Sequence, residues 1–486
     1  MTKKADVSLM PTDIWSTIQA SHTHTVVQIV AHVAQFDWCQ PYRIEDQYES
    51  FGSGFLIDEK GLVVTNAHVI ENAKYIWIQV PILGRKKLDV AVVGICPDRD
   101  IALLKISDDG LHILREALGK IPFLLLGDSD AVASAESVLV LGYPLGQYHV
   151  KSTTGIVSGK EVMLSNLLLQ ITAPINPGSS GGPILNGQGH VVGIAVAIIL
   201  DAQNVGYAIP INELRIIMPD LLSKKIVRKP YLGARFVDAG DEKARFLNNP
   251  LPAGLYIAQV FPHTVCALAG IQAGDMLYEF NGFILDAYGE AQAPWSLDKV
   301  SLHDLISRVV VGDEIKMVIY RSGERKEITC IMKEVVPFAI RTKFPDYEDV
   351  SYETIAGLVI MELTENHIMK LLENCPELIR FRQLENRINS VLIITHIVPG
   401  SYAYQMEELE VGTIVIALNG EQVSTLEDWR NALIKSATSG FVVLLTEHNV
   451  LTVFSLKTII ADDKKLTDAF NYPLSEAFKN IQKNIM

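Results

Sequence analysis

Short apolar runs bounded by turn residues recur along the chain. Leu62–Val64 follows the turn Asp58–Gly61, and Ile101–Leu104 begins directly after Asp100. Runs of this length predict buried strands. The longest, Val191–Leu200, is interpreted as two buried strand halves that line a barrel, because no run approaches the ~20 apolar residues that span a bilayer. The pattern therefore predicts a mainly β protein without a membrane span.

The second half of the chain contains an internal repeat. Residues 254–282 and 391–420 share the order strand, proline turn, short apolar segment, glycine turn, strand and Asn-Gly hairpin turn. The offset between the copies is 137 at Pro262 and Pro399. This order resembles a PDZ domain twice over, which predicts two α+β domains that bind extended peptides as an added strand.

Charge and cysteine content exclude several classes of function. The 486 residues allow about three domains, and a formal net charge of −14 argues against nucleic acid as a principal partner. Five scattered cysteines argue against a disulfide framework and a zinc site, and no metal or other cofactor is expected. Lys3 and Lys4 are not followed by the apolar segment of a signal peptide. We therefore expect a cytoplasmic location, with an organelle, the nucleus or signal-less secretion as open alternatives.

One glycine-rich turn carries the candidate nucleophile. Asn176–Pro183 reads Asn-Pro-Gly-Ser-Ser-Gly-Gly-Pro, so Ser180 lies in a turn whose backbone N–H groups can converge on one point. A nucleophilic serine needs a base, and the base needs an anion that orients it. His68 at the end of one predicted strand and Asp100 at the start of another supply these groups. Taken singly, each of the three is more typical of a turn or a strand end.

These segments resemble the HtrA/Deg family of PDZ-containing serine proteases. Thr65–Val69, Asp100–Ile106 and Asn176–Pro183 correspond to the histidine, aspartate and serine motifs of that family. The resemblance implies a chymotrypsin-like double β-barrel followed by two PDZ-like domains. The catalytic triad that it implies is His68, Asp100 and Ser180.

The same turn is expected to form the oxyanion hole. The backbone N–H groups of Gly178 and Ser180 are the main expected donors, with Ser179 between them. Ser179 stands where the family has asparagine, which is expected to change the flexibility of the turn without abolishing the hole.

The primary specificity pocket is expected to be apolar. Pro174 occupies the position where an acid would select basic residues, so cleavage after Lys or Arg is disfavoured. The opposite strand is apolar and predicts small or medium aliphatic residues before the cleaved bond. Its pocket residues are Ile194, Ala195 and Val196.

The two repeats differ in the loop that would hold a peptide carboxylate. In the first repeat Arg228 and Lys229 precede this loop, and their charge suits an anion. In the second repeat the loop is Ile355–Leu358, and the nearby Glu353 has the wrong sign. We therefore expect peptide capture in the first repeat and assembly or internal docking in the second, with peptide capture as the alternative. The loop of the first repeat is Tyr231, Leu232, Gly233 and Ala234.

The predicted domain order is an amino-terminal segment, a protease domain, two PDZ-like domains and a helical tail. Trp15, Phe36 and Trp38 are expected either to form a subunit contact or to cap the barrel core. Behind Asp462–Lys465, a helix after Pro473 is expected to pack on its own domain, with subunit docking as the alternative. The predicted ranges are 1–24, 25–222, 230–336, 350–461 and 462–486.

Together these features predict an ATP-independent serine endopeptidase of the HtrA/Deg type that acts on unfolded or damaged proteins in quality control. C-terminal peptides are expected to dock on the first repeat. The resemblance implies a homo-oligomer built from trimers. The alternative is a latent-protease chaperone or PDZ scaffold with little proteolytic activity.

Overall fold

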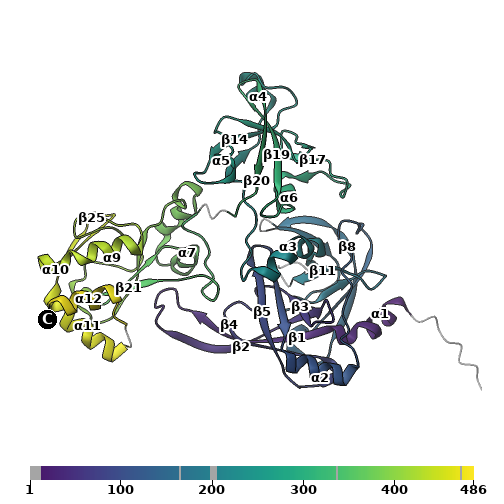
Figure 1. Ribbon diagram of the computed structural model, residues 1–486, viewed down its shortest axis with the longest axis horizontal. Coiled ribbons are helices and arrows are strands. Elements are labelled where there is room, and N and C mark those ends of the chain that lie inside the picture. The colour runs from purple at the N-terminus through teal and green to yellow at the C-terminus, as the bar shows by residue number, and fades with distance from the viewer. Residues whose placement is uncertain (1–12, 164–165, 197–204, 335–337, 471–472, 486) are drawn as a thin grey trace, which may run out of the picture. The chain divides into compact units, whose positions relative to one another are not determined.

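The computed structural model describes residues 13–163, 166–196, 205–334, 338–470 and 473–485 (Figure 1). The chain divides into two compact units, Met1–Val33 with Tyr48–Val335, and Ala34–Gln47 with Val336–Met486. No helix in the described ranges is long and apolar enough to cross a membrane.

The first unit begins with a closed six-stranded barrel. Gly94 lets helix α3 pack closely on this barrel, because a Cβ atom there would lie 2.4 Å from the carbonyl oxygen of Leu221. The strands in barrel order are β1 (Val26–Phe36), β2 (Ile44–Leu56), β3 (Leu62–Thr65), β6 (Ile101–Ile106), β5 (Leu88–Cys96) and β4 (Ala73–Gln79). The helices and 3-10 turns are α1 (Ile14–His22), η1 (Thr23–Thr25), η2 (Pro81–Leu83), η3 (Pro97–Arg99) and α2 (Asp108–Leu118).

A second closed barrel follows and confirms the predicted mainly β, chymotrypsin-like fold. Five of the six residues of β11 are buried, as expected for a strand that lines a barrel core. The remainder of the predicted run 191–200 lies outside the described residues. The strands in barrel order are β10 (Pro183–Leu185), β11 (Val191–Val196), β12 (Gly206–Pro210), β9 (Asn166–Ile171), β8 (Lys151–Met163) and β7 (Ser137–Gly142). The helical segments are η4 (Pro144–Gly146) and α3 (Ile211–Ser223).

The first repeat packs within the same unit as the barrels. Its main sheet has the order β13-β14-β15-β19-β20, so β13 is an outer strand. The strands are β13 (Ala234–Val237), β14 (Leu255–Val260), β15 (Met276–Phe280), β16 (Phe283–Ile284), β17 (Glu290–Ala291), β18 (Val300–Ser301), β19 (Glu314–Arg321) and β20 (Glu324–Ile331). The helices are α4 (Asp241–Phe246), α5 (Val265–Leu268) and α6 (Leu302–Ser307).

The second repeat has the same succession of strands, with one strand added at the beginning. Its sheet order is β21-β22-β23-β24-β26-β27. The strands are β21 (Tyr352–Ile355), β22 (Leu358–Glu362), β23 (Leu392–Ile397), β24 (Ile414–Leu418), β25 (Glu421–Gln422), β26 (Phe441–Thr446) and β27 (Leu451–Ser455). The helical segments are α7 (Glu365–Leu371), η5 (Pro376–Arg382), η6 (Leu384–Asn386), α8 (Tyr402–Met406), α9 (Leu426–Ile434), α10 (Ser436–Ser439), α11 (Leu456–Phe470) and α12 (Glu476–Ile485).

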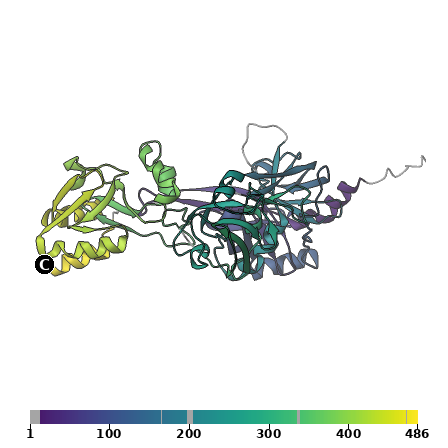
Figure 2. The same cartoon turned by 90° about the horizontal axis from the view of Figure 1, so that it is seen from above.

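The tail of the chain packs on the second repeat. Phe478 and Ile481 of α12 are buried in the core of this repeat, as expected for the helix after Pro473. The predicted helical tail contains a further helix, since Asp462–Lys465, placed ahead of the expected helix, lies inside α11. Figure 2 shows these helices along one side of the repeat.

The tip of the β1–β2 hairpin also packs on the second repeat. The rings of Trp38 and His367 meet edge to face with centroids 5.1 Å apart, and the Thr395 hydroxyl donates to the carbonyl of Cys39 at 3.0 Å. Phe36 and Trp38 therefore do not cap the barrel core, whereas Trp15 packs against it. Sequence periodicity could not show this, because the partners are distant in the chain.

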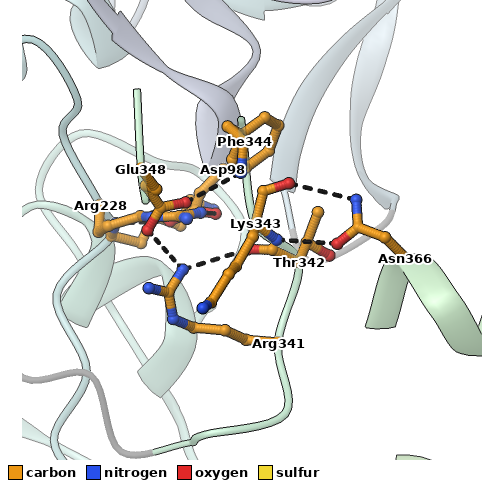
Figure 3. Close-up of polar contacts among 9 residues, drawn as sticks. Asp98, Arg228, Arg341, Thr342, Lys343, Phe344, Glu348 and Asn366 are labelled. Carbon is orange, nitrogen blue, oxygen red and sulfur yellow. Dashed lines mark hydrogen bonds and ion pairs between the residues drawn. The ribbon is translucent and has the colours of Figure 1, made fainter. Parts of the chain in front are cut away.

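The segment between the repeats is folded on α7. The main chain of Lys343 exchanges two hydrogen bonds with the Asn366 side chain, at 2.9 and 3.2 Å (Figure 3). Arg341 and Glu348 form an ion pair of 2.6 Å (Figure 3). The polar residues of this segment thus serve local hydrogen bonds and an ion pair.

Candidate active site

Two antiparallel strands bring His68 and Asp100 together. β3 pairs with β6 so that Thr65 lies opposite Ala102, which places the end of one strand beside the start of the other. Nδ1 of His68 lies 2.7 Å from Oδ2 of Asp100. The backbone N–H of His68 donates to Oδ1 of Asp100 at 2.9 Å. Both carboxylate oxygens are therefore held by one residue, which fixes the carboxylate against the imidazole.

Asp100 itself is held in a left-handed backbone conformation with φ of 55°. Its N–H donates to the carbonyl of Pro97 at 3.1 Å, and the Asn66 side chain donates to its carbonyl at 3.0 Å. A left-handed non-glycine residue costs roughly 1–3 kcal/mol and persists only where its surroundings impose it. Here the surroundings aim a carboxylate at His68.

The charges around His68 favour its protonated form. Burial lowers the pKa of His68, but the hydrogen bond and charge of Asp100, together with the charge of Glu71, outweigh burial and raise it above 6.5. A raised pKa makes the imidazole a better acceptor for a serine proton.

Ser180 directly follows a tight turn that only glycine allows. Gly178 has φ of 92°, and the N–H of Ser179 donates to the carbonyl of Asn176 at 2.9 Å, which is the geometry of a type II turn. A Cβ atom at Gly178 would lie 2.5 Å from the Tyr143 carbonyl oxygen. Ser179 and Ser180 are both buried. Gly178 and Ser179 thus lie in this turn, and Ser180 follows it directly.

Ser53 is a further residue of this site that sequence analysis did not single out. Its hydroxyl donates to the carbonyl of Gly178 at 2.7 Å and accepts from the N–H of Tyr143 at 2.9 Å. Its backbone N–H donates to the carbonyl of Ser180 at 2.8 Å. Ser53 belongs to β2 of the first barrel and is fully buried. It therefore ties the serine turn of the second barrel to the barrel that carries the histidine and aspartate.

The predicted pocket residues occupy different environments. Pro174 is exposed at the surface. Ile194 packs into the large barrel core, while Ala195 packs in a separate cluster with Ile171 and Ala173. Val196 is half-buried at the end of β11. The strand meets the serine turn directly, since the N–H of Gly181 donates to the carbonyl of Ala195 at 2.9 Å.

The predicted carboxylate loop lies at the start of β13. Gly233 has φ of 88°, and its carbonyl accepts from the N–H of Phe261 at 2.8 Å. Arg228 pairs with Asp98 of the barrel at 3.3 Å (Figure 3), and the backbone N–H of Lys229 donates to the same carboxylate at 2.9 Å. Burial and the charge of Arg99 lower the pKa of Lys229. The Arg228 charge expected to serve a peptide anion is thus paired with Asp98, and Lys229 is held beside the same carboxylate by its backbone.

Two arginines connect the first repeat with the barrels. Arg308 makes a bidentate ion pair with Asp130, at 2.8 and 2.7 Å. Arg99 is 1% exposed, pairs with Glu213 of α3 at 3.1 Å and donates to the carbonyl of Ser307 at 2.5 Å. Since Arg99 directly precedes Asp100, the first repeat touches the segment that positions the candidate aspartate.

Comparisons with known proteins agree with this architecture. The trypsin-like peptidase domain family matches residues 52–194. The chain is 31% identical to the putative serine protease HhoB of Synechocystis over 58% of its length and 68% of that protein. It is 27% identical to a probable periplasmic serine endoprotease DegP-like of Marinomonas over 79% of its length and 74% of that protein. The solved HtrA-type protease AlgW with decapeptide shares the fold, with a TM-score of 0.51 at 22% identity over 66% of this chain and 99% of that one.

The comparisons correct one prediction and establish the family. The expected cytoplasmic location is wrong, because the DegP-like relatives of Marinomonas and Chlamydia trachomatis are named periplasmic. That expectation rested on the first residues of the sequence and on the five scattered cysteines, whereas the relatives match most of the folded chain. With two barrels, a trypsin-like domain and relatives of this extent, the chain belongs to the HtrA/DegP family of serine endoproteases.

Proposed function

We propose that this chain is an ATP-independent endopeptidase that degrades unfolded or damaged proteins outside the cytoplasm. Ser180 is the nucleophile, His68 the general base and acid, and Asp100 the group that orients His68. The observation that carries the proposal is the 2.7 Å pair of His68 and Asp100 beside a serine turn tied to the same barrel by Ser53. Membership of a serine endoprotease family supports the reaction class.

In this mechanism the hydroxyl oxygen of Ser180 attacks the substrate carbonyl carbon while Nε2 of His68 takes its proton. The oxygen of the tetrahedral intermediate accepts hydrogen bonds from the N–H groups of Gly178 and Ser180. His68 then protonates the leaving amine, which departs and leaves an acyl-enzyme. Water attacks the acyl carbon as His68 takes a proton, and return of that proton to Ser180 releases the acid product. Asp100 stays ionised and stabilises the imidazolium.

Substrate delivery forms the second part of the proposal. A C-terminal carboxylate docks on the loop around Gly233, and the peptide extends along β13, the outer strand of its sheet. The solved HtrA-type protease with a decapeptide supports peptide docking as a property of such proteins. Assembly into trimers follows from the family resemblance and would appear in light scattering as three times the chain mass of 53.7 kDa.

The test compares Ser180→Ala with Ser179→Ala. Casein cleavage and labelling by a serine-directed fluorophosphonate are measured on the full chain. We expect Ser180→Ala to lose both signals and Ser179→Ala to keep labelling, because only Ser180 is activated by His68. Activity retained by Ser180→Ala but lost in Ser179→Ala would place the nucleophile one residue earlier. A wild-type chain that neither labels nor cleaves would favour the latent chaperone or scaffold.

A further inference from the structure

The two loops at Gly233 and Gly357 share the conformation of their glycine and the hydrogen bonds on both sides of it. The carbonyl of Gly233 accepts from Phe261 N–H at 2.8 Å, and the carbonyl of Gly357 accepts from Val398 N–H at 2.8 Å. Both glycines have positive φ, 88° and 86°. The preceding residues follow the same pattern, with Cys266 N–H donating to Leu232 and Ala403 N–H donating to Ala356. The loops differ at one residue, since Ala356 also has a positive φ of 55° and forms with Gly357 a two-residue turn between Ile355 and Leu358.

The edge beside this loop differs between the repeats. In the described part of the first repeat, no strand pairs with the outer edge of β13. In the second repeat β21 covers the corresponding edge of β22, antiparallel, with Tyr352 opposite Met361 and Ile355 opposite Leu358. A peptide bound to a PDZ domain adds to the sheet as a strand and ends at the carboxylate loop. β21 has that position and runs into the loop through a turn at residues 356–357.

The side chains of β21 contact the helix that flanks this edge. Glu353 is 4% exposed, and its carboxylate pairs with Arg430 of α9 at 2.6 Å. Ile355 is buried in the same core as Trp429 of α9. Residues two apart in a strand share a face, so Glu353 and Ile355 point to the same side. β21 thus makes a strand pairing on one side and helix contacts on the other, as a peptide ligand does.

A carboxylate of the tail occupies the loop itself. Asp463 of α11 is fully buried, and its Oδ2 accepts from the N–H of Ala356 at 3.3 Å. The neighbouring Asp462 accepts from the N–H of Tyr402 at 2.7 Å. The group that a peptide terminus would present is therefore already supplied by the chain.

The filled edge also faces the β1–β2 hairpin. Phe36, Trp38 and Tyr42 pack in one cluster with residues of β21 and β22. The rings of Tyr42 and Tyr352 have centroids 6.5 Å apart. β21 consequently contributes to the surface on which the hairpin tip lies.

We propose that the second repeat carries its own ligand, with β21 in its peptide groove and Asp463 in its carboxylate loop, and that its partner is the hairpin tip at residues 34–47 of this chain. It does not capture C-terminal peptides. This inference is independent of the proposed proteolysis, because it concerns only contacts within the second repeat and the hairpin.

The test uses a decapeptide that ends in Tyr-Glu-Thr-Ile with a free carboxylate, the sequence of β21, and carries a benzophenone. The carrier is the full chain with Ser180→Ala, so the peptide is not cut. Photo-adducts are mapped by mass spectrometry. We expect no adduct in residues 352–434. The double substitution Glu353→Lys and Asp463→Ala is made to displace β21, because it places a positive charge beside Arg430 and removes the carboxylate from the loop. We expect it to raise the adduct yield in residues 352–434 at least tenfold.

The matched control is Glu421→Lys with Asp468→Ala, which changes two exposed acids of the same repeat and should leave adduct yield unchanged. The opened variant is the Ser180→Ala chain with Glu353→Lys and Asp463→Ala. The proposal would be overturned if the Ser180→Ala chain without these two substitutions gave as many adducts in the second repeat as the opened variant. An opened, folded variant that gains no adducts would also overturn it. If the opened variant unfolds, hydrogen exchange in the Ser180→Ala chain tests whether β21 occupies the groove. The amides of β21 that pair with β22 must then exchange as slowly as those of β22, and their exchange within seconds would refute self-occupancy.

Discussion

Ser53→Ala tests whether the serine turn depends on the first barrel. The substitution removes a hydroxyl that donates to the Gly178 carbonyl at 2.7 Å and accepts from the Tyr143 N–H at 2.9 Å. Ser53 is fully buried, so each group left without this partner costs about 1–3 kcal/mol. The turn gains freedom at the residue whose N–H is the proposed oxyanion donor. Loss of one such donor typically lowers kcat by about 10²–10³-fold.

We therefore expect Ser53→Ala to lower kcat by between about 10-fold and 10³-fold while KM changes little, because the oxyanion hole acts mainly on the transition state. Steady-state cleavage of a fluorogenic peptide gives both constants, and the rate of fluorophosphonate labelling reports the turn independently. Ser137→Ala, an exposed serine of the second barrel, is the control. If Ser53→Ala lowered the melting temperature but left kcat within twofold, Ser53 would stabilise the fold without positioning the turn.

Three further outcomes follow from ionisable side chains of the two units. Activity should fall at acid pH as His68 is protonated, with a midpoint above pH 6.5 because the pKa of His68 is raised. Asp100→Asn should move this midpoint to lower pH. A pH–rate profile with an optimum near pH 4 would contradict the mechanism. Burial raises the pKa of Asp463 from 3.8 to about 7. Between these two pH values the folded state holds a proton that the unfolded state has lost. The free energy of unfolding of the second repeat should therefore fall by roughly 4 kcal/mol as the pH rises through this interval. Hydrogen exchange of α11 between pH 4 and 8 measures this fall, and Asp463→Asn should flatten it. Arg99→Met should destabilise the first unit by about 3–5 kcal/mol in denaturant, because Glu213 loses its buried partner; an unchanged midpoint would show that solvent already screens the pair.

The barrels and the serine turn could be predicted because their signals are local. An apolar run such as β3 followed by a turn needs only neighbouring residues to be recognised. A glycine in a turn motif predicts a positive φ, and Gly178 and the Asn-Gly turns of both repeats have it. The triad order was read from motifs, and the pairing of β3 with β6 explains why the first two members meet.

Other features depend on contacts between distant parts of the chain. Ser53 looks like any small residue of a Gly-Ser-Gly strand, and its role exists only because the second barrel brings Gly178 to it. Asp463 lies in a run of charges that is typical of a solvated turn, yet the second repeat buries it completely. A polar residue used as an internal ligand has the same local pattern as one that faces water, so sequence periodicity cannot separate the two.

Asp98, Arg99 and Asp100 show how such contacts converge on the candidate site. Arg99 between two acids looks like part of an exposed charge cluster, but it is 1% exposed and bound to Glu213 and to the carbonyl of Ser307 in the first repeat. The 3-10 turn that imposes the left-handed conformation on Asp100 ends at Arg99. A side chain held at both ends within a buried site resists displacement, since any movement leaves a charge unpaired. The first repeat therefore contributes to the rigidity of the turn from which Asp100 reaches the histidine.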